Sequence, residues 1–302
     1  MAPVAEALAH PAAAEDVASW RLAAPAKLNL WLSVVGRRAD GFHELDSHLA
    51  LLELADEVSV EPGGAGLKVD GPAAADVPGD LTNLAWRGWA AGLAGRSHGG
   101  TVSVHKRIPA AAGLGGGSSD AAAAWRLARW VTRQGDDPPT ADDLVALGAI
   151  GADIPFFAAR LARARVRGLG ERVDLGGRAE ATRLPGPPRE VVLVHPPFGL
   201  RTGAVFAELR RDEWSGAVTG AELALGRNDL EAAARRLRPE LNDVFRLVAG
   251  AGGEPHLTGS GPTLFALTND PERAEGVAAR LKRAGLTTTR TRLRLEPASI
   301  ER

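Results

Sequence analysis

The stretch Ile108–Trp125, IPAAAGLGGGSSDAAAAW, places a glycine-rich segment directly before a run of alanines. Glycine occupies four of the five positions from 113 to 117, and alanine occupies positions 121 to 124. Glycine loses the most conformational freedom when it is fixed, whereas alanine is the best helix former. Ser118, Ser119 and Asp120 lie at the border and are residue types that cap helix N-termini. The sequence therefore predicts a loop of unusual backbone conformation that leads directly into a helix.

Such a loop exposes backbone N–H groups at the positive end of the helix dipole, an arrangement that binds phosphate. A dinucleotide fingerprint would follow a first strand and have an acid about 20 residues further on, but here only Asp136 and Asp137 follow, in a predicted turn. A P-loop needs Gly-Lys-Ser/Thr, and this loop contains no lysine. A flexible linker is not expected between a strand and a strong helix. The pattern favours a phosphate-binding loop whose cationic partner comes from elsewhere.

Composition bounds the class of protein. The 302 residues suffice for two ordinary domains or one large one. The chain has 36 Lys and Arg residues and 37 Asp and Glu residues, so its net charge is close to zero. Proteins that bind nucleic acid or a membrane surface usually carry an excess of basic residues, so this balance argues against both kinds of partner. Cysteine is absent, which excludes disulfides and thiolate chemistry and favours the cytoplasm. Residues 1–20 lack the basic start of a secretory signal, and we expect an N-terminal extension there.

Strands and helices are mixed without a strict βαβ rhythm, which favours an α+β fold. Before the loop, alternation from Ala26 predicts a strand that ends at Gly36, with Leu28 on a buried face and Lys27 on the opposite face. Further predicted strands and helices before the loop cover residues 54–63, 66–71, 81–95 and 100–109. The helix after the loop is expected to end near Gly135.

Downstream of that helix, Thr140 and Asp143 have capping-box spacing and predict a helix that ends around 148–151. Ile154 precedes a proline and is expected to be extended. The arginine-rich segment 158–172 predicts a solvent-exposed hairpin. A proline and glycine cluster then predicts a domain boundary, which divides the chain into residues 21–185 and 186–302. In the second part, strands and helices are predicted at 191–194, 203–209, 230–237, 256–268, 271–285 and 287–295.

Three candidate functional features are weak when each is considered alone. Periodicity favours a solvent-facing Lys27, the usual position of a lysine on an edge strand. Asp153 follows a predicted helix, where an aspartate is most often a turn or cap residue. The segment LTGSGP, residues 257–262, is a second glycine loop that could be an ordinary turn.

Together these features resemble the GHMP kinases, in which an N-terminal strand with a basic residue, a central ATP loop and a C-terminal glycine loop occur in this order. The resemblance covers residues 22–294 and is carried by PAKLNLWLSVVGRRADGFHEL, KRIPAAAGLGGGSSDAAAA, LGAIGADIPFF and LTGSGPTLFAL. The glycine loop identifies only the superfamily. The PAKLNL and DGFHEL pair is more specific and resembles the members that act on a cytidine-diphosphate-linked methylerythritol.

The resemblance implies a two-domain GHMP kinase fold, with a ribosomal-S5-like ATP-loop domain followed by a ferredoxin-like domain. It implies transfer of a phosphoryl group from ATP, with Mg²⁺, to the tertiary 2-hydroxyl of the cytidine-linked substrate, in the non-mevalonate route to isoprenoid precursors. We expect the small-molecule substrate to be the partner, with no nucleic acid and no membrane. We expect the protein to be a monomer or a homodimer.

The resemblance also assigns roles. Asp153 is expected to take the hydroxyl proton, and Lys27 to keep that carboxylate ionised and to stabilise the developing charge. Asn29 is expected to hold the erythritol, and Ser119 to lie near Mg²⁺. The expected ATP-binding residues are Pro109, Ala110, Ala111, Ala112, Gly113, Leu114, Gly115, Gly116, Gly117, Ser118 and Ser119. The other expected substrate-binding residues are Phe42 and His43 at the cytosine, Phe206 as a second stacking ring, and Gly259, Ser260 and Gly261 at the phosphate site.

The chain departs from the family pattern in two places. After ADIPF the expected small residues are replaced by an arginine-rich segment, and position 42 is Phe where Tyr is common. For Phe206, a place in the core is as strongly expected as a stacking role. Homoserine and mevalonate kinases are the alternative enzymes, but they lack a DGFHEL loop. A non-catalytic nucleotide-binding relative would be expected to have lost Lys27 or Asp153, and both are present.

Overall fold

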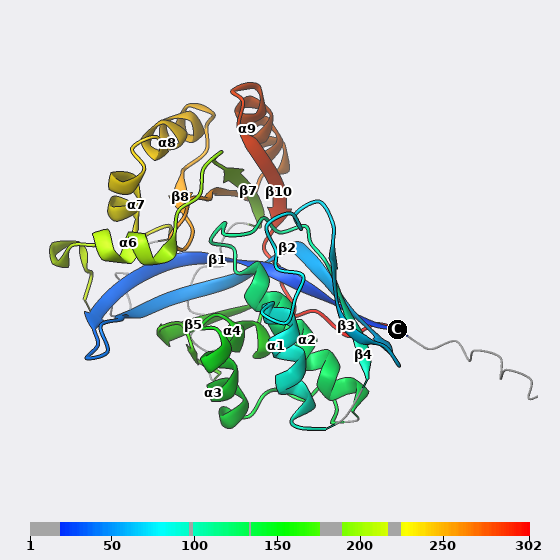
Figure 1. Ribbon diagram of the computed structural model, residues 1–302. Helices are drawn as coiled ribbons and strands as arrows, with labels where there is room; N and C mark the ends of the chain where they lie inside the picture. Colours follow the sequence, from blue (N-terminus) through cyan, green and yellow to red (C-terminus); the bar gives the residue numbers. More distant parts are fainter. Residues whose placement is uncertain (1–18, 97–98, 133, 176–188, 217–224) are drawn as a thin grey trace, which may run out of the picture.

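The computed structural model describes residues 19–96, 99–132, 134–175, 189–216 and 225–302, which form two β-sheets with helices on their outer sides. Figure 1 shows the long strands β1 and β2 running across the centre of the molecule. Helices α1 to α4 lie on one side of these strands, and the second sheet with its helices lies on the other. The mixture of sheets and helices agrees with the expected α+β fold.

The first sheet is organised around β2, a strand of 20 residues. One edge of β2 pairs antiparallel with β1 along most of its length, and the other edge pairs with β4 and then β5. The strands are β1 (Trp20–Arg37), β2 (His43–Pro62), β3 (Ala65–Asp70), β4 (Gly100–His105), β5 (Arg163–Gly168) and β6 (Arg172–Val173). Sequence periodicity predicted only the second half of β2, because its first half carries Asp46, Ser47 and His48 among the apolar residues.

Within the described residues, four helices cover this sheet: α1 (Leu84–Leu93), α2 (Gly116–Val131), α3 (Ala141–Ile150) and α4 (Ile154–Ala158). Helices α1 and α2 pack closely because α1 has glycines at the contact. A Cβ atom at Gly88 would lie 2.1 Å from the carbonyl oxygen of Ala121, and one at Gly92 would lie 2.4 Å from that of Trp125. The predicted capping box of α3 is confirmed, since Asp143 N donates to Thr140 Oγ1 and Thr140 N donates to Asp143 Oδ2.

The second sheet is antiparallel in the order β10-β7-β9-β8. Its strands are β7 (Glu190–His195), β8 (His256–Leu257), β9 (Leu264–Thr268) and β10 (Thr287–Arg292). The accompanying helices are α6 (Thr202–Glu208), α7 (Glu231–Leu237), α8 (Leu241–Gly250) and α9 (Pro271–Arg283), with a 3₁₀ turn, η1, at Arg211–Glu213. Helix α8 was not predicted.

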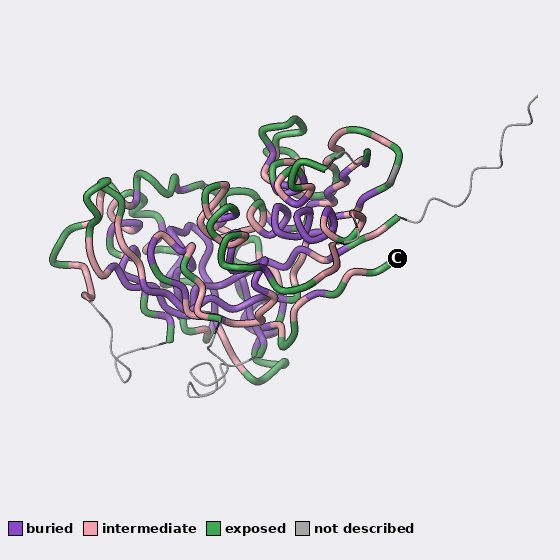
Figure 2. The backbone as a smooth tube through the Cα atoms, turned by 90° about the horizontal axis from the view of Figure 1, so that it is seen from below, coloured by how far each residue is buried: buried purple, intermediate pink, exposed green. Residues whose placement is uncertain are grey.

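Strand β7 joins the two halves of the molecule through its alternating side chains. Val192 and Val194 pack into the core beneath α8 and α9. Val191 and Leu193 point the other way, into a buried cluster with Leu28 of β1. Figure 2 shows the resulting continuous buried interior, with exposed backbone confined to the periphery.

Two local predictions are wrong. Ile154 is helical, not extended, because it is the first residue of α4, where the proline that follows is tolerated and the isoleucine side chain is fully buried. The arginine-rich hairpin is not fully solvent-exposed, since β5 pairs with β2 and buries Ala164 and Val166. Residues 1–18 and the predicted boundary at 185/186 lie outside the described residues, so the division into domains stays a prediction.

Candidate active site

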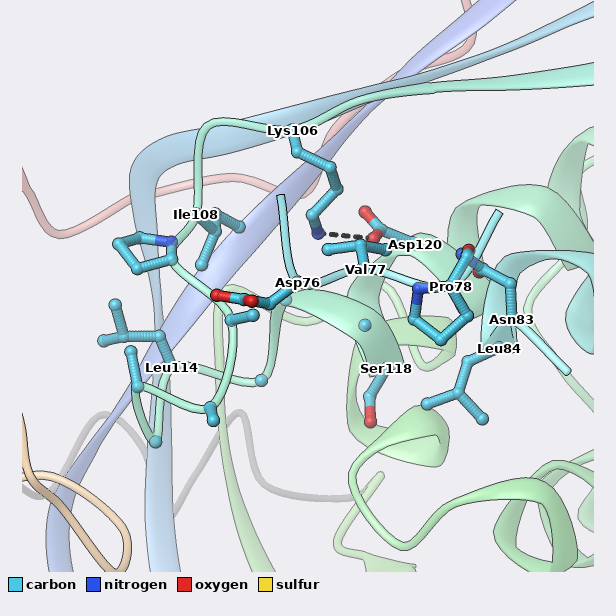
Figure 3. A pocket seen from close by; sticks show the side chains of 18 of the residues that line it. Asp76, Val77, Pro78, Asn83, Leu84, Lys106, Ile108, Leu114, Ser118 and Asp120 are labelled. Carbon is cyan, nitrogen blue, oxygen red and sulfur yellow. Dashed lines mark hydrogen bonds and ion pairs between the residues drawn. The ribbon is translucent and has the colours of Figure 1, made fainter. Parts of the chain in front are cut away.

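The glycine loop connects β4 to α2, and its last residues form an open helix N-terminus. Helix α2 begins at Gly116 with Gly115 as its N-cap, at φ 71° and without a side-chain hydrogen bond. The first-turn N–H groups are therefore not capped by a side chain. They border a cavity of about 520 Å³, the loop cavity (Figure 3). Its lining includes all the predicted ATP-binding residues except Ser119, which is buried.

The two glycine loops lie directly against each other. Gly113 has φ +74°, and a Cβ atom there would lie 2.7 Å from the carbonyl oxygen of Thr258. Gly259 has φ +57°, and its Cβ would lie 3.2 Å from the carbonyl oxygen of Gly113 and 3.6 Å from Lys27 Nζ. Glycine is required at both positions for backbone conformation and for close approach. The second loop, LTGSGP, is therefore more than an ordinary turn.

A buried cluster of three charged residues supports the loop cavity from behind. Lys106 Nζ donates to Asp120 Oδ2 at 2.6 Å and also to Asp56, and Figure 3 shows its ammonium directed at Asp120. Asp56 additionally accepts hydrogen bonds from the backbone N–H groups of Arg107 and Ile108, immediately before the loop. The cluster thus joins β2, the end of β4 and the N-terminal half of α2.

The cluster contains two carboxylates and one ammonium group, and this excess of acidic groups affects the pKa of Asp120. Burial raises the pKa of Asp120 to about 8; the Lys106 ammonium opposes this rise and the Asp56 carboxylate adds to it. For Lys106, burial alone would lower the pKa, but the two carboxylates outweigh it and raise the pKa. Asp120 Oδ1 has no hydrogen-bond partner among the described residues.

Asp120→Asn is expected to flatten the dependence of stability on pH. Between the ordinary pKa of 3.8 and the native value of about 8, the folded protein holds a proton that the unfolded chain releases, so the free energy of unfolding falls as pH rises. Asparagine does not titrate. Urea titrations at about pH 5 and pH 8 should show the free energy of unfolding of wild type falling by up to about 4 kcal/mol more than that of the variant. The exposed Asp142→Asn is the control, and equal slopes for wild type and Asp120→Asn would contradict the prediction.

Lys27 is buried, with only 4% of its surface exposed, so the interpretation from periodicity alone was wrong. Helix α2 packs over this face of β1, and a Cβ at Gly115 would lie 3.1 Å from Lys27 Cγ. Lys27 Nζ donates to Asn29 Oδ1 at 2.7 Å and lies 3.9 Å from Asp153 Oδ2. Burial lowers the pKa of Lys27, and the negative charge of Asp153 opposes that shift.

Asp153 stands at the N-cap position of α4, but its side chain makes no capping hydrogen bond. Instead it lines a cavity of about 280 Å³, the central cavity, together with Lys27 and Asn29. Ser118 and Gly259 also line this cavity, which brings residues from both glycine loops to the same space. Of the two readings of Asp153, a cap residue or a site residue, the geometry supports the second.

A third cavity, the outer cavity of about 520 Å³, holds the predicted aromatic residues. Phe42 is 62% exposed on the loop between β1 and β2. His43 begins β2 and stacks on Phe206 of α6, with ring centroids 5.3 Å apart. Phe206 is half-buried and also packs against the core of the second half. Phe206 therefore packs against a core and lines the outer cavity at once, and its stacking role toward cytosine stays a prediction.

Comparison with known proteins agrees with this geometry. Residues 83–159 match the family described as "GHMP kinases N terminal domain", and residues 209–286 match "GHMP kinases C terminal". The 4-diphosphocytidyl-2-C-methyl-D-erythritol kinase of Paracoccus denitrificans is 39% identical over 274 residues, which cover 86% of this chain and 91% of that protein. The kinase of the same name from Rhizorhabdus wittichii is 41% identical over 251 residues, covering 80% and 83%.

The chain belongs to the 4-diphosphocytidyl-2-C-methyl-D-erythritol kinase family. A crystal structure of 4-(cytidine 5'-diphospho)-2C-methyl-D-erythritol kinase is similar to this chain at 35% identity and TM-score 0.71, covering 90% of this chain and 98% of that one. The homoserine kinase from Cytophaga hutchinsonii has TM-score 0.66 but only 16% identity, covering 97% and 99%, and shows the shared fold alone. The expected GHMP kinase fold is confirmed.

In this kinase, sequence reasoning missed one residue that the fold places centrally. Thr202, the first residue of α6, lines the loop, central and outer cavities alike. Its hydroxyl lies 3.0 Å from that of Ser260 in the second glycine loop. Thr202 directly precedes the helix predicted at 203–209, so the sequence marks it only as a polar residue at a helix start. Sequence alone does not tell which cavity such a residue meets.

Proposed function

We propose that this kinase transfers the γ-phosphate of ATP to the tertiary 2-hydroxyl of 4-diphosphocytidyl-2-C-methyl-D-erythritol, with the pair Lys27 and Asp153 at the reacting atoms. The observation that carries the proposal is the position of the central cavity, which Lys27 and Asp153 line and which shares lining residues with both the loop cavity and the outer cavity. Gly113, Gly115 and Ser118 line both the loop cavity and the central cavity. Leu45, Ala152, Leu169 and Phe206 line both the central cavity and the outer cavity. The loop cavity, the central cavity and the outer cavity therefore provide adjoining sites for ATP, for the alcohol and for the cytidine nucleotide, respectively.

A tertiary alcohol is hindered and weakly acidic, so positioning and neutralisation of charge carry most of the catalysis. Asp153 accepts the proton of the hydroxyl as the oxygen attacks the γ-phosphorus atom, and ADP leaves on the opposite side. Lys27 stabilises the negative charge on the attacking oxygen and the transferring phosphoryl group. The backbone N–H groups of the glycine loop and the first turn of α2 hold the remaining phosphates.

Asn29 orients Lys27 within this arrangement. Its Oδ1 accepts from Lys27 Nζ, and its Nδ2 donates to Ser47 Oγ at 2.9 Å. The hydroxyl of Ser47 in turn donates to the carbonyl oxygen of Trp31 at 2.6 Å. This chain of hydrogen bonds fixes the lysine, and the second amide hydrogen of Asn29 is the group proposed to bind an erythritol hydroxyl.

Magnesium is proposed to enter with ATP. In the part of the chain that the structure describes, no cluster of three or more His, Cys, Asp or Glu residues could hold a metal. The hydroxyl of Ser118 lines both the loop cavity and the central cavity, and one such oxygen donor suits Mg²⁺, which keeps phosphate and water ligands. When bound, Mg²⁺ neutralises the charge on the phosphates. Ser119, the predicted ligand, is 1% exposed, so we assign this role to Ser118 instead.

A coupled assay of ADP release tests the proposal. Purified protein with ATP and Mg²⁺ is given the cytidine-linked alcohol, homoserine or mevalonate in separate reactions. Turnover is expected only with the cytidine-linked alcohol, because only that substrate fills the outer cavity as well as the central one. Turnover with another alcohol would leave the assignment of the ATP loop intact, but it would contradict the roles proposed for Phe42, His43 and Phe206.

Phe206→Ala is expected to weaken binding of the cytidine-linked alcohol by about tenfold to a hundredfold, the usual cost of losing one base–aromatic stack. The affinity for ATP should change little, because Phe206 does not line the loop cavity as the structure describes it. KM values for both substrates check this. Phe245→Ala, in the same core and away from the three cavities, is the matched control for a lost core ring. Equal effects of both variants on the two KM values would mean that Phe206 acts only in the core.

Two further expectations stay predictions. None of the helices in the described ranges is long and apolar enough to cross a membrane. The cytoplasm as location and a monomer or homodimer as assembly are proposed from composition and from the family.

A further inference from the structure

His43 is enclosed by two aromatic rings from the second half of the molecule. The Phe206 ring stacks on the imidazole at 5.3 Å with an interplanar angle of 22°. The Trp214 indole meets it at 5.3 Å and 87°, an edge-on contact. Both geometries are favourable for aromatic pairs. The imidazole is therefore held from two directions, and Trp214 was not among the residues expected at the site.

The segment that carries Trp214 is tied down on both sides of the indole. Glu213, the residue before it, accepts from Arg236 Nη2 at 2.9 Å. Ser215, the residue after it, donates its backbone N–H to Asp229 Oδ2 at 2.8 Å, and its hydroxyl donates to the same carboxylate. A tryptophan between two such anchors has little freedom to move away from its neighbour.

These two anchors also connect Trp214 with the strand and the helix that form the site. Asp229 Oδ2 accepts from the backbone N–H of Val34 in β1 at 2.8 Å. Arg236 donates to Glu208 Oε1 at 2.9 Å and to the Glu208 carbonyl oxygen at 2.8 Å, at the end of the helix that carries Phe206. One arginine thus fixes both aromatic neighbours of His43 relative to each other.

A further cavity explains why the indole matters. This rear cavity, about 580 Å³, is lined by Trp214, His43 and Phe206 together with Val35, Gly36, Arg37, Ala207, Leu209 and Arg211. His43 and Phe206 also line the outer cavity, so the imidazole forms part of the partition between the two spaces. If the indole were removed, the imidazole could turn into the rear cavity and leave the wall of the outer cavity.

We propose that Trp214 is a positioning residue, which holds the His43 imidazole in the wall of the outer cavity and thereby sets the selectivity for cytosine. The inference rests on the proposed function, because it takes the outer cavity as the place of the base. Cytosine offers an amino donor and a ring-nitrogen acceptor where uracil offers the reverse. A fixed imidazole pairs with the cytosine pattern and not with the uracil pattern, whereas an imidazole that has turned out of the wall pairs with neither base.

The test compares the binding of cytidine 5'-diphosphate and uridine 5'-diphosphate by calorimetry in the full-length protein. Trp214→Ala is expected to weaken the binding of cytidine diphosphate by about tenfold, because a loss of that size corresponds to one well-oriented hydrogen bond. The binding of uridine diphosphate is expected to change little. The KM for ATP and the value of kcat should stay close to wild type. Trp214→Phe, which keeps a ring edge against His43, should restore most of the selectivity, and it remains informative if the alanine variant does not fold.

Trp130→Ala is the matched control, because Trp130 makes the same kind of edge contact, with Trp20, at 5.5 Å and 73°. It should leave the selectivity unchanged. A double-mutant cycle decides whether Trp214 acts through His43: in a His43→Ala background, Trp214→Ala should have no further effect on selectivity. An undiminished effect in that background, or unchanged selectivity in Trp214→Ala itself, would overturn the inference. If wild type does not prefer cytidine diphosphate at all, the assignment of the outer cavity falls, and with it the substrate of the proposed function.

Discussion

Asp153→Asn is expected to reduce turnover by about 10²–10⁴-fold, the usual contribution of a positioned general base. Asparagine keeps the size of the side chain but cannot take the proton of the tertiary hydroxyl. The affinity for ATP should be nearly unchanged, because the triphosphate is held by backbone N–H groups of the glycine loop. Single-turnover rates and ATP binding by equilibrium dialysis measure the two quantities separately.

The control for this substitution is Asp142→Asn, an exposed carboxylate in the first turn of α3. It should be fully active. If Asp153→Asn lost ATP binding and turnover in equal measure, Asp153 would be structural. If it retained full turnover, another group would have to accept the proton, and the central cavity would have been assigned wrongly.

Lys27→Met is expected to lower kcat by about 10²–10³-fold, which is typical for the loss of one preorganised group that stabilises transition-state charge. Methionine fills much the same volume in the buried site but carries no charge. KM values should move less than kcat, because the lysine acts mainly on charge that develops during the transfer. Lys27→Arg should not restore full activity, because a planar guanidinium group is larger than an ammonium group and places its charge differently.

The measurement is a steady-state comparison of kcat and both KM values, with Lys68→Met as the control, because Lys68 is a well-exposed lysine on β3. A drop confined to the KM for ATP would reassign Lys27 to nucleotide binding alone. Thermal melts of both variants would reveal a loss of folded protein, which must be separated from a loss of chemistry.

Much of the site could be predicted from local sequence, because its key parts are continuous motifs. The glycine loop, Asp153 and the second glycine loop each lie in a segment whose composition is unusual by itself. Lys27 shows the limit of periodicity. The alternation of β1 correctly identifies two faces, but it cannot reveal that helices from later in the chain cover the polar face as well. Only the resemblance to a family pointed to a site there.

The features that escaped prediction depend on contacts between distant segments. Asp56 looks like an ordinary strand residue, yet it ends within reach of Lys106 because β2 lies beside β4 in the sheet. Trp214 follows an exposed, charged stretch and becomes part of the site only through Arg236 and Asp229. The prediction for Ile154 used only the proline that follows it, whereas burial among side chains of α2 and α3 decided its conformation. Long-range packing chooses among local alternatives that the sequence leaves nearly equal.

The burial of β7 on both of its faces affects how substrates bind and products are released. Val191 and Leu193 share one fully buried cluster with Leu28, Ile108 and Phe265, contributed by both halves of the molecule. Exposing these side chains to water would cost on the order of ten kcal/mol, comparable to the entire stability of a typical protein. The halves therefore do not swing apart like a hinge between turnovers. Substrates and products must enter and leave through the openings of the cavities. The rate at which ADP and the phosphorylated product dissociate therefore depends on small rearrangements of side chains and loops, and not on separation of the two sheets.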